Sequence, residues 1–162
     1  MNELVRVFVT GGTFDKEYNE RNGSLFFKDS HLRDMLKLAR SLVDVEVRTL
    51  MMVDSLDMDD EDREVILSQC RKSPQNRIVI THGTDTMIDT ARALVGIANK
   101  TSVLTGAMQP ARFRHTDAVF NIASAMMAAQ TLSAGVYIAM NGQVFDPHSS
   151  RKNVELNRFE KI

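Results

Sequence analysis

Short apolar runs alternate along the chain with segments in which apolar residues recur every three or four positions. The apolar, β-branched runs predict strands at residues 4–10, 43–50, 77–81, 102–105 and 135–140. The segments with helical spacing predict helices at residues 31–40, 59–71, 86–98 and 116–132. From residue 141 onward we expect an irregular tail, with a short β-turn at Asn141 and Gly142.

The alternation of strands and helices determines the expected fold class. It predicts an α/β, doubly wound, mostly parallel five-stranded sheet with helices on both faces, in the flavodoxin-like strand order 2-1-3-4-5. In such sheets ligands bind outside the carboxyl ends of the strands, where the order reverses between the first and third strands. The loops at this point begin at Gly11 and His82, so we expect these two loops to line the functional site.

Size and composition indicate a single domain over residues 1–162. Apolar residues make up 43% and charged residues 25% of the chain, as in ordinary globular proteins. Twenty basic against 21 acidic residues give a net charge of −1, which argues against a nucleic-acid partner. The single cysteine, Cys70, excludes an internal disulfide and a thiolate metal cluster. We expect a cytoplasmic protein with no membrane partner, because the start lacks a signal pattern and the longest apolar run, 122–129, is too short to span a bilayer.

The loop after the first strand reads TGGT at residues 10–13. Two glycines after a strand allow a sharp turn and a close approach of backbone to a ligand. The simplest interpretation is a tight turn, and a phosphate site is disfavoured because neither common phosphate-binding motif is present. A third interpretation is that the loop presents the Thr13 hydroxyl as a nucleophile.

The loop after the third strand contains a hydroxyl next to a carboxylate, Thr84 and Asp85. One interpretation is that either residue caps the helix that follows. The other is catalytic, because a nucleophile needs a base and a group that orients the base, and these two residues are expected to face Thr13.

Six segments in the same order resemble the bacterial-type L-asparaginase family. They are TGGT at 10–13, VDSLD at 53–57, THGTDTM at 81–87, GAMQP at 106–110, the pair Asp117 and Asn121, and the stretch 144–152 that ends at Lys152. Leu56 and Gln109 stand where the family usually has glutamine and arginine.

The resemblance implies a mechanism and its residues. Thr13 would attack a side-chain amide carbonyl, ammonia would leave, and water would release the acid from an acyl-enzyme. A second set of groups would consist of the Thr84 hydroxyl, the Asp85 carboxylate and the Lys152 amine. We expect these groups in a desolvated pocket that keeps part of the Lys152 amine neutral near pH 7. Backbone N–H groups after Asp85 could stabilise the oxyanion. The resemblance implies no metal and no organic cofactor.

Substrate contacts are expected from Gly12, Gly83 and Ser55, the last mapping to the family's substrate-binding serine. Asp57 is the one member of the acidic run 54–64 that we expect to face the site, while the rest of that run is typical of a solvated helix start rather than a Ca²⁺ loop.

Three further side chains have two interpretations each. The long polar stretch 14–29 is a candidate lid, and Tyr18 would take the place of the family's lid tyrosine, although an ordinary exposed tyrosine explains it equally. Arg112 and His115 are either surface charge or a binding site for a substrate carboxylate.

The chain stops ten residues past Lys152, whereas full-length members of the family continue into a second domain, which we expect to be absent here. The leading hypothesis is an amidohydrolase acting on asparagine or a related small amide, working as a homo-oligomer (a dimer or tetramer) that closes the site. The alternative is a non-catalytic domain that binds a small amide or carboxylate, as a sensor or as a subunit of an amidotransferase-like assembly. A nucleotide-binding domain is a third hypothesis, based on fold analogy alone.

Overall fold

A six-stranded sheet forms the centre of the protein in a computed structural model that describes residues 3–162. The sheet strands, in spatial order, are β4 (Val45–Val53), β1 (Val5–Gly11), β5 (Arg77–Thr81), β6 (Thr101–Thr105), β7 (Gly135–Met140) and β8 (Gln143–Phe145). The first five pair in parallel, and β8 pairs antiparallel with β7. The predicted α/β class with a mostly parallel sheet is confirmed.

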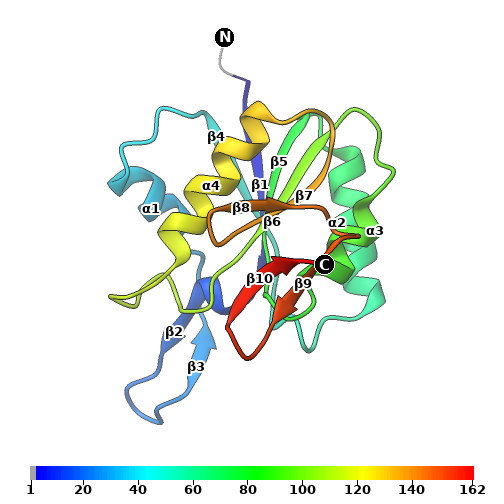
Figure 1. The fold of residues 1–162 in the computed structure, drawn as a ribbon. Helices are drawn as coiled ribbons and strands as arrows, with labels where there is room; N and C mark the ends of the chain where they lie inside the picture. The colour runs from blue at the N-terminus through cyan, green and yellow to red at the C-terminus, as the bar shows by residue number, and fades with distance from the viewer. Residues whose placement is uncertain (1–2) are drawn as a thin grey trace.

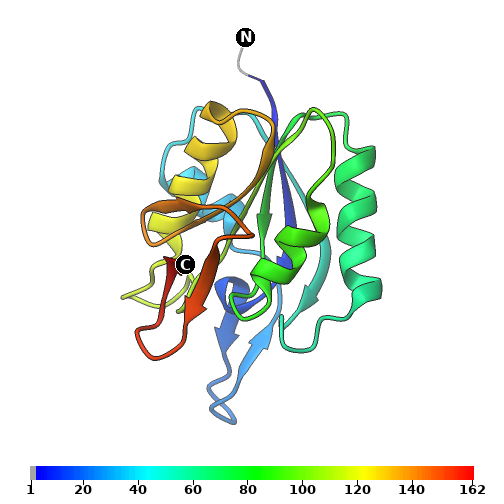
Figure 2. The same cartoon turned by 45° about the vertical axis from the view of Figure 1, so that its right-hand side comes forward.

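Four helices cover the sheet, two on each face (Figures 1 and 2). They are α1 (Leu32–Leu38), α2 (Asp60–Lys72), α3 (Met87–Leu94) and α4 (Ala118–Thr131). The helices α1 and α4 pack on one face, with Val7, Val79 and Val103 of the sheet beneath them. The helices α2 and α3 pack on the other, over Phe8 and Ile80. Alternate residues of the buried strands therefore contribute to two separate cores.

The chain after β7 differs from the expectation. The predicted turn is present, with Asn141 at φ 53° and Gly142 at φ 72°, and such left-handed values suit a two-residue hairpin. The turn folds β8 back onto β7, so the predicted count of five strands is wrong. The prediction of an irregular tail is also wrong, because a second hairpin follows, formed by β9 (Ser150–Asn153) and β10 (Arg158–Lys161).

Two small hairpins lie near the carboxyl ends of the parallel strands (Figure 1). One is the β9–β10 hairpin. The other is an arm formed by β2 (Lys16–Tyr18) and β3 (Leu25–Phe27), which follows the 3₁₀ turn η1 (Thr13–Asp15) and projects from the body of the molecule. The stretch 14–29, expected as a long polar loop, is therefore largely this arm.

The acidic run before α2 has a structural function. Asp59 accepts a hydrogen bond from the Asp62 backbone, and the Asp62 carboxylate accepts one from the Asp59 backbone, which together form a capping box. The expected solvated helix start is thus confirmed.

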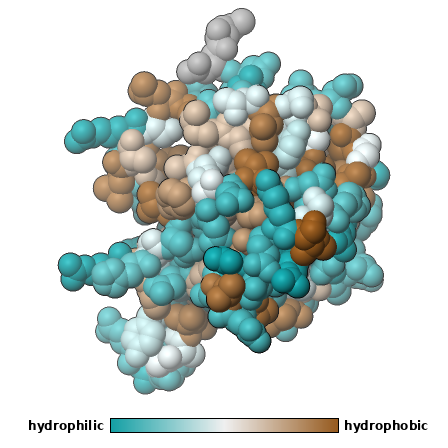
Figure 3. Space-filling view, viewed as in Figure 1, coloured by the Kyte–Doolittle hydropathy of each residue, from teal (hydrophilic) through white to brown (hydrophobic). Residues whose placement is uncertain are grey.

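Apolar side chains on the outer surface gather over α4 and α1, whereas the surface over β9 and β10 is mostly hydrophilic (Figure 3). Within residues 3–162, no helix is both long enough and apolar enough to cross a membrane.

Candidate active site

Two glycines bring the first and third loops into contact. A Cβ atom at Gly12 would lie 2.4 Å from the Gly83 backbone nitrogen, so the two backbones touch at this point. Gly12 has φ 77° and its N–H donates to the Val53 carbonyl, which fixes the loop against the end of β4. Since Thr13 and Thr84 each follow one of these glycines, the contact places the two threonines on facing loops.

Ser55 joins the same junction from the loop after β4. A Cβ atom at Gly83 would lie 2.5 Å from both Cβ and Oγ of Ser55. The Thr86 hydroxyl donates to the Ser55 carbonyl over 2.8 Å, and the Ser55 side chain is almost fully buried. The structure therefore brings together Gly12, Gly83 and Ser55, three of the residues predicted to contact a substrate.

Lys152 forms the centre of the polar contacts at this junction. Its Nζ donates to Thr84 Oγ1 over 2.8 Å and to Asp85 Oδ1 over 2.7 Å. The Lys152 side chain is 15% exposed and that of Asp85 is 40% exposed, while Thr84 is buried. The hydroxyl, carboxylate and amine that the sequence suggested as one set are thus in direct contact.

The β9–β10 hairpin holds Lys152 in place. Lys152 pairs in register with Phe159 of β10, and Phe159 is buried against Phe145, with 6.2 Å between ring centroids. The Phe159 N–H also donates to Asn141 Oδ1 over 2.8 Å. These contacts tie the hairpin to the end of the sheet, so the lysine extends from an anchored strand instead of a loose tail.

The helix-capping interpretation of Thr84 and Asp85 is wrong. The N-cap of α3 is Thr86, which makes no side-chain capping bond, and the two residues before it turn toward Lys152.

A second ion pair lies beside the site, and no local pattern in the sequence indicates it. Lys16 of the arm contacts Asp54 Oδ2 over 2.5 Å and lies over the Phe27 ring, 5.5 Å from its centroid. The Lys16 hydrogen bond holds the pKa of the Asp54 carboxyl below its usual range, and the charge of Lys152 contributes in the same direction. Asp54 therefore links the base of the arm to the loop that carries Ser55.

Thr13 begins η1 and is half-buried. Tyr18 is at the end of β2 with 56% of its surface exposed, and its hydroxyl lies near Gly23 of its own hairpin. The structure thus places Tyr18 on the arm, over the arm's turn.

Arg112 contacts the arm and α1 instead of Lys152. Its Nε donates to His31 Nδ1 over 3.1 Å, and its Nη2 lies 3.5 Å from Glu17 Oε1. His115 and Asp57 are exposed, and Asp57 closes a turn with its N–H on the Asp54 carbonyl. The roles of these three residues toward a substrate stay predictions.

Asp117 and Asn121 support the loop after β6. The Asp117 carboxylate accepts from the backbone N–H groups of Met108 and Gln109, and Asn121 Nδ2 donates to the Gly106 carbonyl over 3.0 Å. This part of the pattern is therefore built into the scaffold that surrounds the site.

His82 also belongs to the scaffold. It is fully buried, with Nδ1 2.7 Å from the Gly83 carbonyl and Nε2 2.7 Å from Thr90 Oγ1. Burial lowers its pKa to about 4, so the ring is neutral and its Nδ1–H donates to Gly83. The histidine thereby fixes the carbonyl next to Thr84.

The arrangement offers two hydroxyls on facing loops, an amine in contact with one of them and a carboxylate that orients the amine. This is the set that acyl transfer requires. Among residues 3–162, no three His, Cys, Asp or Glu side chains are grouped so that they could hold a metal ion.

Known proteins with similar sequences and folds match nearly the whole chain. The family described as "Asparaginase, N-terminal" matches residues 4–160. The probable periplasmic L-asparaginase of Haemophilus influenzae is 30% identical over 153 residues, which cover 86% of this chain and 43% of the relative. A glutamyl-tRNA(Gln) amidotransferase subunit of Methanococcus vannielii is 29% identical over 150 residues, or 88% of this chain and 35% of the relative.

A solved structure agrees with these relatives. The thermostable L-asparaginase from Thermococcus kodakarensis superposes with a TM-score of 0.81 at 28% identity, covering 98% of this chain and 51% of that one. The chain thus spans about half the length of these relatives, or less.

Proposed function

The chain belongs to the family of asparaginase N-terminal domains, and from this premise we propose that it is an amidohydrolase that releases ammonia from asparagine or a related small amide. The observation that carries the proposal is the contact of Lys152 Nζ with Thr84 Oγ1 and Asp85 Oδ1, on a loop whose backbone touches the Thr13 loop. A hydroxyl needs a base to become a nucleophile. Lys152 is within hydrogen-bond distance of Thr84 Oγ1, on the loop that faces Thr13.

In the proposed reaction, Thr13 Oγ1 forms a bond to the amide carbon, the carbon–nitrogen bond breaks, and the threonine proton leaves with ammonia. Water then attacks the acyl ester, which yields the acid and returns a proton to Thr13. Thr84 and Lys152 transfer protons in these steps, and Asp85 orients the amine. Backbone N–H groups at the start of α3 are the proposed donors to the oxyanion.

The proposed substrate contacts are Gly12, Gly83 and Ser55 at the loop junction, with Asp57 at its edge. Tyr18 would act from the arm, and Arg112 and His115 would attract a substrate carboxylate. These assignments rest on the family pattern, and for the first three also on the contact of their loops.

The second candidate is a domain that binds a small amide or carboxylate without turnover, as a sensor or as a subunit of an amidotransferase-like assembly. The similarity to a protein named as an amidotransferase subunit favours it. The intact Thr84, Asp85 and Lys152 contacts favour the enzyme instead, since binding alone does not require a paired base.

We further propose a homo-oligomer, either a dimer or a tetramer. Part of the Asp85 side chain is open to solvent, and a neighbouring subunit over the site would exclude water from the reaction. The cytoplasmic location stays a prediction.

Ammonia release from L-asparagine, L-glutamine and a panel of small amides tests the proposal. We expect release from at least one of them, and a loss of more than ~100-fold in Thr13→Ala, the scale expected when a nucleophile is removed. Thr49→Ala, an exposed threonine on β4, is the matched control and should keep wild-type activity. A thermal shift with an amide and no ammonia from any compound would instead support the binding domain.

A further inference from the structure

A cavity of about 630 Å³ lies between α1 and the loop that follows β6. It is lined by His31, Asp34, Met35, Lys37, Leu38, Arg40, Ala111 and Arg112. Sites for small organic molecules usually occupy about 300–1,000 Å³, so the volume is sufficient for one. None of the residues proposed for the amide chemistry lines it except Arg112.

The lining combines positive charge with an apolar surface. Lys37, Arg40 and Arg112 are the basic residues of the lining, and Asp34 is its single acidic residue. Met35, Leu38 and Ala111 supply the apolar part, and Leu38 is 84% exposed. The excess of positive charge favours an anion, and the apolar side chains favour a hydrocarbon group attached to it.

The Arg112 guanidinium is held in place at one wall of this cavity. His31, itself buried, accepts from Arg112 Nε through Nδ1 and has its Nε2 3.5 Å from Glu17 Oε1. Glu17 is also 3.5 Å from Arg112 Nη2. Because these contacts use one edge of the guanidinium, its other N–H groups remain available to a carboxylate, which arginine binds well.

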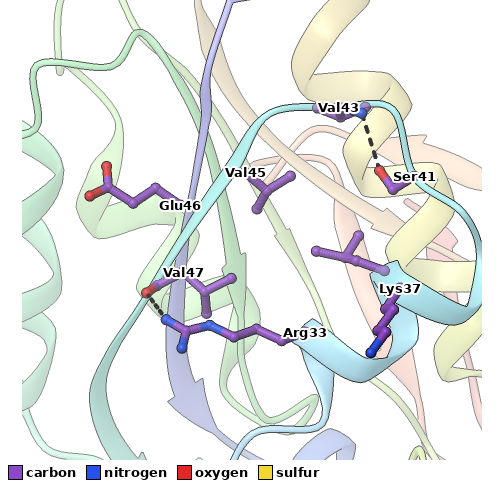
Figure 4. A pocket seen from close by; sticks show the side chains of 8 residues that line it. Arg33, Lys37, Ser41, Val43, Val45, Glu46 and Val47 are labelled. Carbon is purple, nitrogen blue, oxygen red and sulfur yellow. Dashed lines mark hydrogen bonds between the residues drawn. The ribbon is translucent and has the colours of Figure 1, made fainter.

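A neighbouring cavity on the other side of α1 is a weaker candidate (Figure 4). It measures about 380 Å³ and lies between α1 and β4. Two of its polar side chains are already paired, since Arg33 donates to the Val47 carbonyl over 3.0 Å and Ser41 Oγ accepts from the Val43 N–H. Lys37 lines both cavities. It therefore offers fewer free donors than the cavity beside Arg112.

We propose that the cavity between α1 and the β6–α4 loop binds a small organic carboxylate with an apolar body, and that this site is coupled to the arm. The carboxylate pairs with Arg112, Lys37 and Arg40, and the hydrocarbon covers Leu38 and Met35. A ligand carboxylate on the remaining N–H groups of Arg112 places a second negative charge next to Glu17 of β2 and repels it. The same wall contacts the candidate nucleophile loop, because the Ala111 N–H donates to the Phe14 carbonyl over 3.0 Å.

Titration of the whole protein with hexanoate, followed by calorimetry, tests the binding step without reference to any enzymatic activity. We expect saturable binding of one hexanoate per chain and none of hexylamine, which has the same hydrocarbon and the opposite charge. The double variant Lys37→Gln/Arg40→Asn should weaken binding by about tenfold or more, because it removes two of the three charge-assisted contacts. Asparagine at position 40 suits the left-handed backbone there, where φ is 52°.

Arg71→Gln/Lys72→Gln is the matched control, because it removes two exposed positive charges from α2 on the opposite face of the sheet. It should bind hexanoate as the wild type does. The proposal is overturned if hexanoate shows no saturable binding, if hexylamine binds equally, or if Arg71→Gln/Lys72→Gln loses as much affinity as Lys37→Gln/Arg40→Asn.

Hydrogen exchange of the arm amides tests the coupling. We expect saturating hexanoate to change hydrogen exchange in β2 and β3, since its negative charge beside Arg112 weakens the contact between Arg112 and Glu17 of the arm. Saturable binding that leaves this exchange unchanged would overturn the coupling to the arm.

Discussion

Asp15, two residues after Thr13, is a buried carboxylate with incomplete pairing. Its Oδ1 accepts from the His31 N–H over 2.9 Å and from Ser30 Oγ over 3.1 Å. Its Oδ2 is buried without a hydrogen-bond partner among residues 3–162. Burial raises the pKa of the Asp15 carboxyl above its usual value, and the bonds from His31 and Ser30 oppose this. The ionised form therefore costs the folded state free energy at neutral pH.

We predict that Asp15→Asn stabilises the protein by about 1 kcal/mol at pH 7, since asparagine keeps the acceptor and removes the buried charge. Because folding raises the pKa of Asp15, the wild type is not destabilised by this residue below the pKa of an unfolded aspartate. It loses stability as the pH rises through the pKa of Asp15 in the folded protein. The gain should therefore shrink as pH falls toward about 4. Urea unfolding of both proteins at several pH values measures it. Asp29→Asn, an exposed neighbour, should change little, and a less stable Asp15→Asn at pH 7 would contradict the prediction.

His82 gives a pH dependence of opposite sign. Burial lowers its pKa to about 4, while an unfolded histidine titrates near about 6.5. Between these values the unfolded chain binds the extra proton, so the unfolding free energy should fall as pH drops from about 6.5 toward about 4. In His82→Gln this fall should be smaller, whereas His148→Gln, an exposed histidine, should keep it. If the unfolding free energy of His82→Gln falls with pH as steeply as that of the wild type, His82 does not cause the fall.

At the scale of elements, the site depends on how closely three loops pack at the strand ends. Gly12 touches Gly83, and Gly83 touches Ser55, so each loop approaches its neighbour where one of them has no side chain. The arm adds a second connection through the Lys16–Asp54 pair. Displacement of one loop is expected to move the others, because the backbones have no free space between them.

We predict that Gly12→Ala destabilises the protein by about 2 kcal/mol or more and abolishes amide hydrolysis. A Cβ there would lie 2.4 Å from the Gly83 nitrogen, and the residue has a left-handed φ of 77°. Gly96→Ala separates the two causes, because Gly96 has φ 101° with open space around it. Urea unfolding of Gly96→Ala should show a smaller loss of unfolding free energy than that of Gly12→Ala, and its amide hydrolysis should be normal. Equal losses of unfolding free energy in Gly12→Ala and Gly96→Ala would show that backbone strain alone accounts for the destabilisation.

The sequence predicted the parts of the fold that depend on local pattern. The buried strands are continuous apolar runs, and the Asn141–Gly142 turn has a strong two-residue signal. The strands β8, β9 and β10 were missed because they are three or four residues long and show no apolar run. β8 and β10 mix polar with apolar side chains, and β9 is polar throughout. Such segments become strands through their partners, as Lys152 does opposite Phe159.

The same limit applies to the candidate site. Thr84, Asp85 and Lys152 were identified through motifs, and the structure brings them into contact. Two other groups of contacts match no motif, because they join residues far apart in sequence. They are the Lys16–Asp54 pair and the contacts of Arg112 with Glu17 and His31. Only the folded arm brings these groups together.

At the scale of the whole molecule, we predict a dimer or tetramer in solution. Three exposed apolar side chains lie on α4, namely Val119, Phe120 and Met127, and apolar surface gathers over this helix in Figure 3. This surface and the open side of the site both favour a covering partner. Light scattering at micromolar concentration should give a mass of at least twice the 18.2 kDa of one chain. A mass of 18.2 kDa over the working concentration range would contradict this prediction.

The central claim is that the Thr13 and Thr84 loops form one centre that cleaves an amide through an acyl-enzyme. Rapid quenching of the wild type with a hydrolysed amide, followed by peptide mass mapping, tests it most directly. We expect the acyl group on the peptide that contains Thr13, and no acylated peptide in Thr13→Ala. Ammonia release without an acylated peptide, or an acyl group on a residue other than Thr13, would contradict the account.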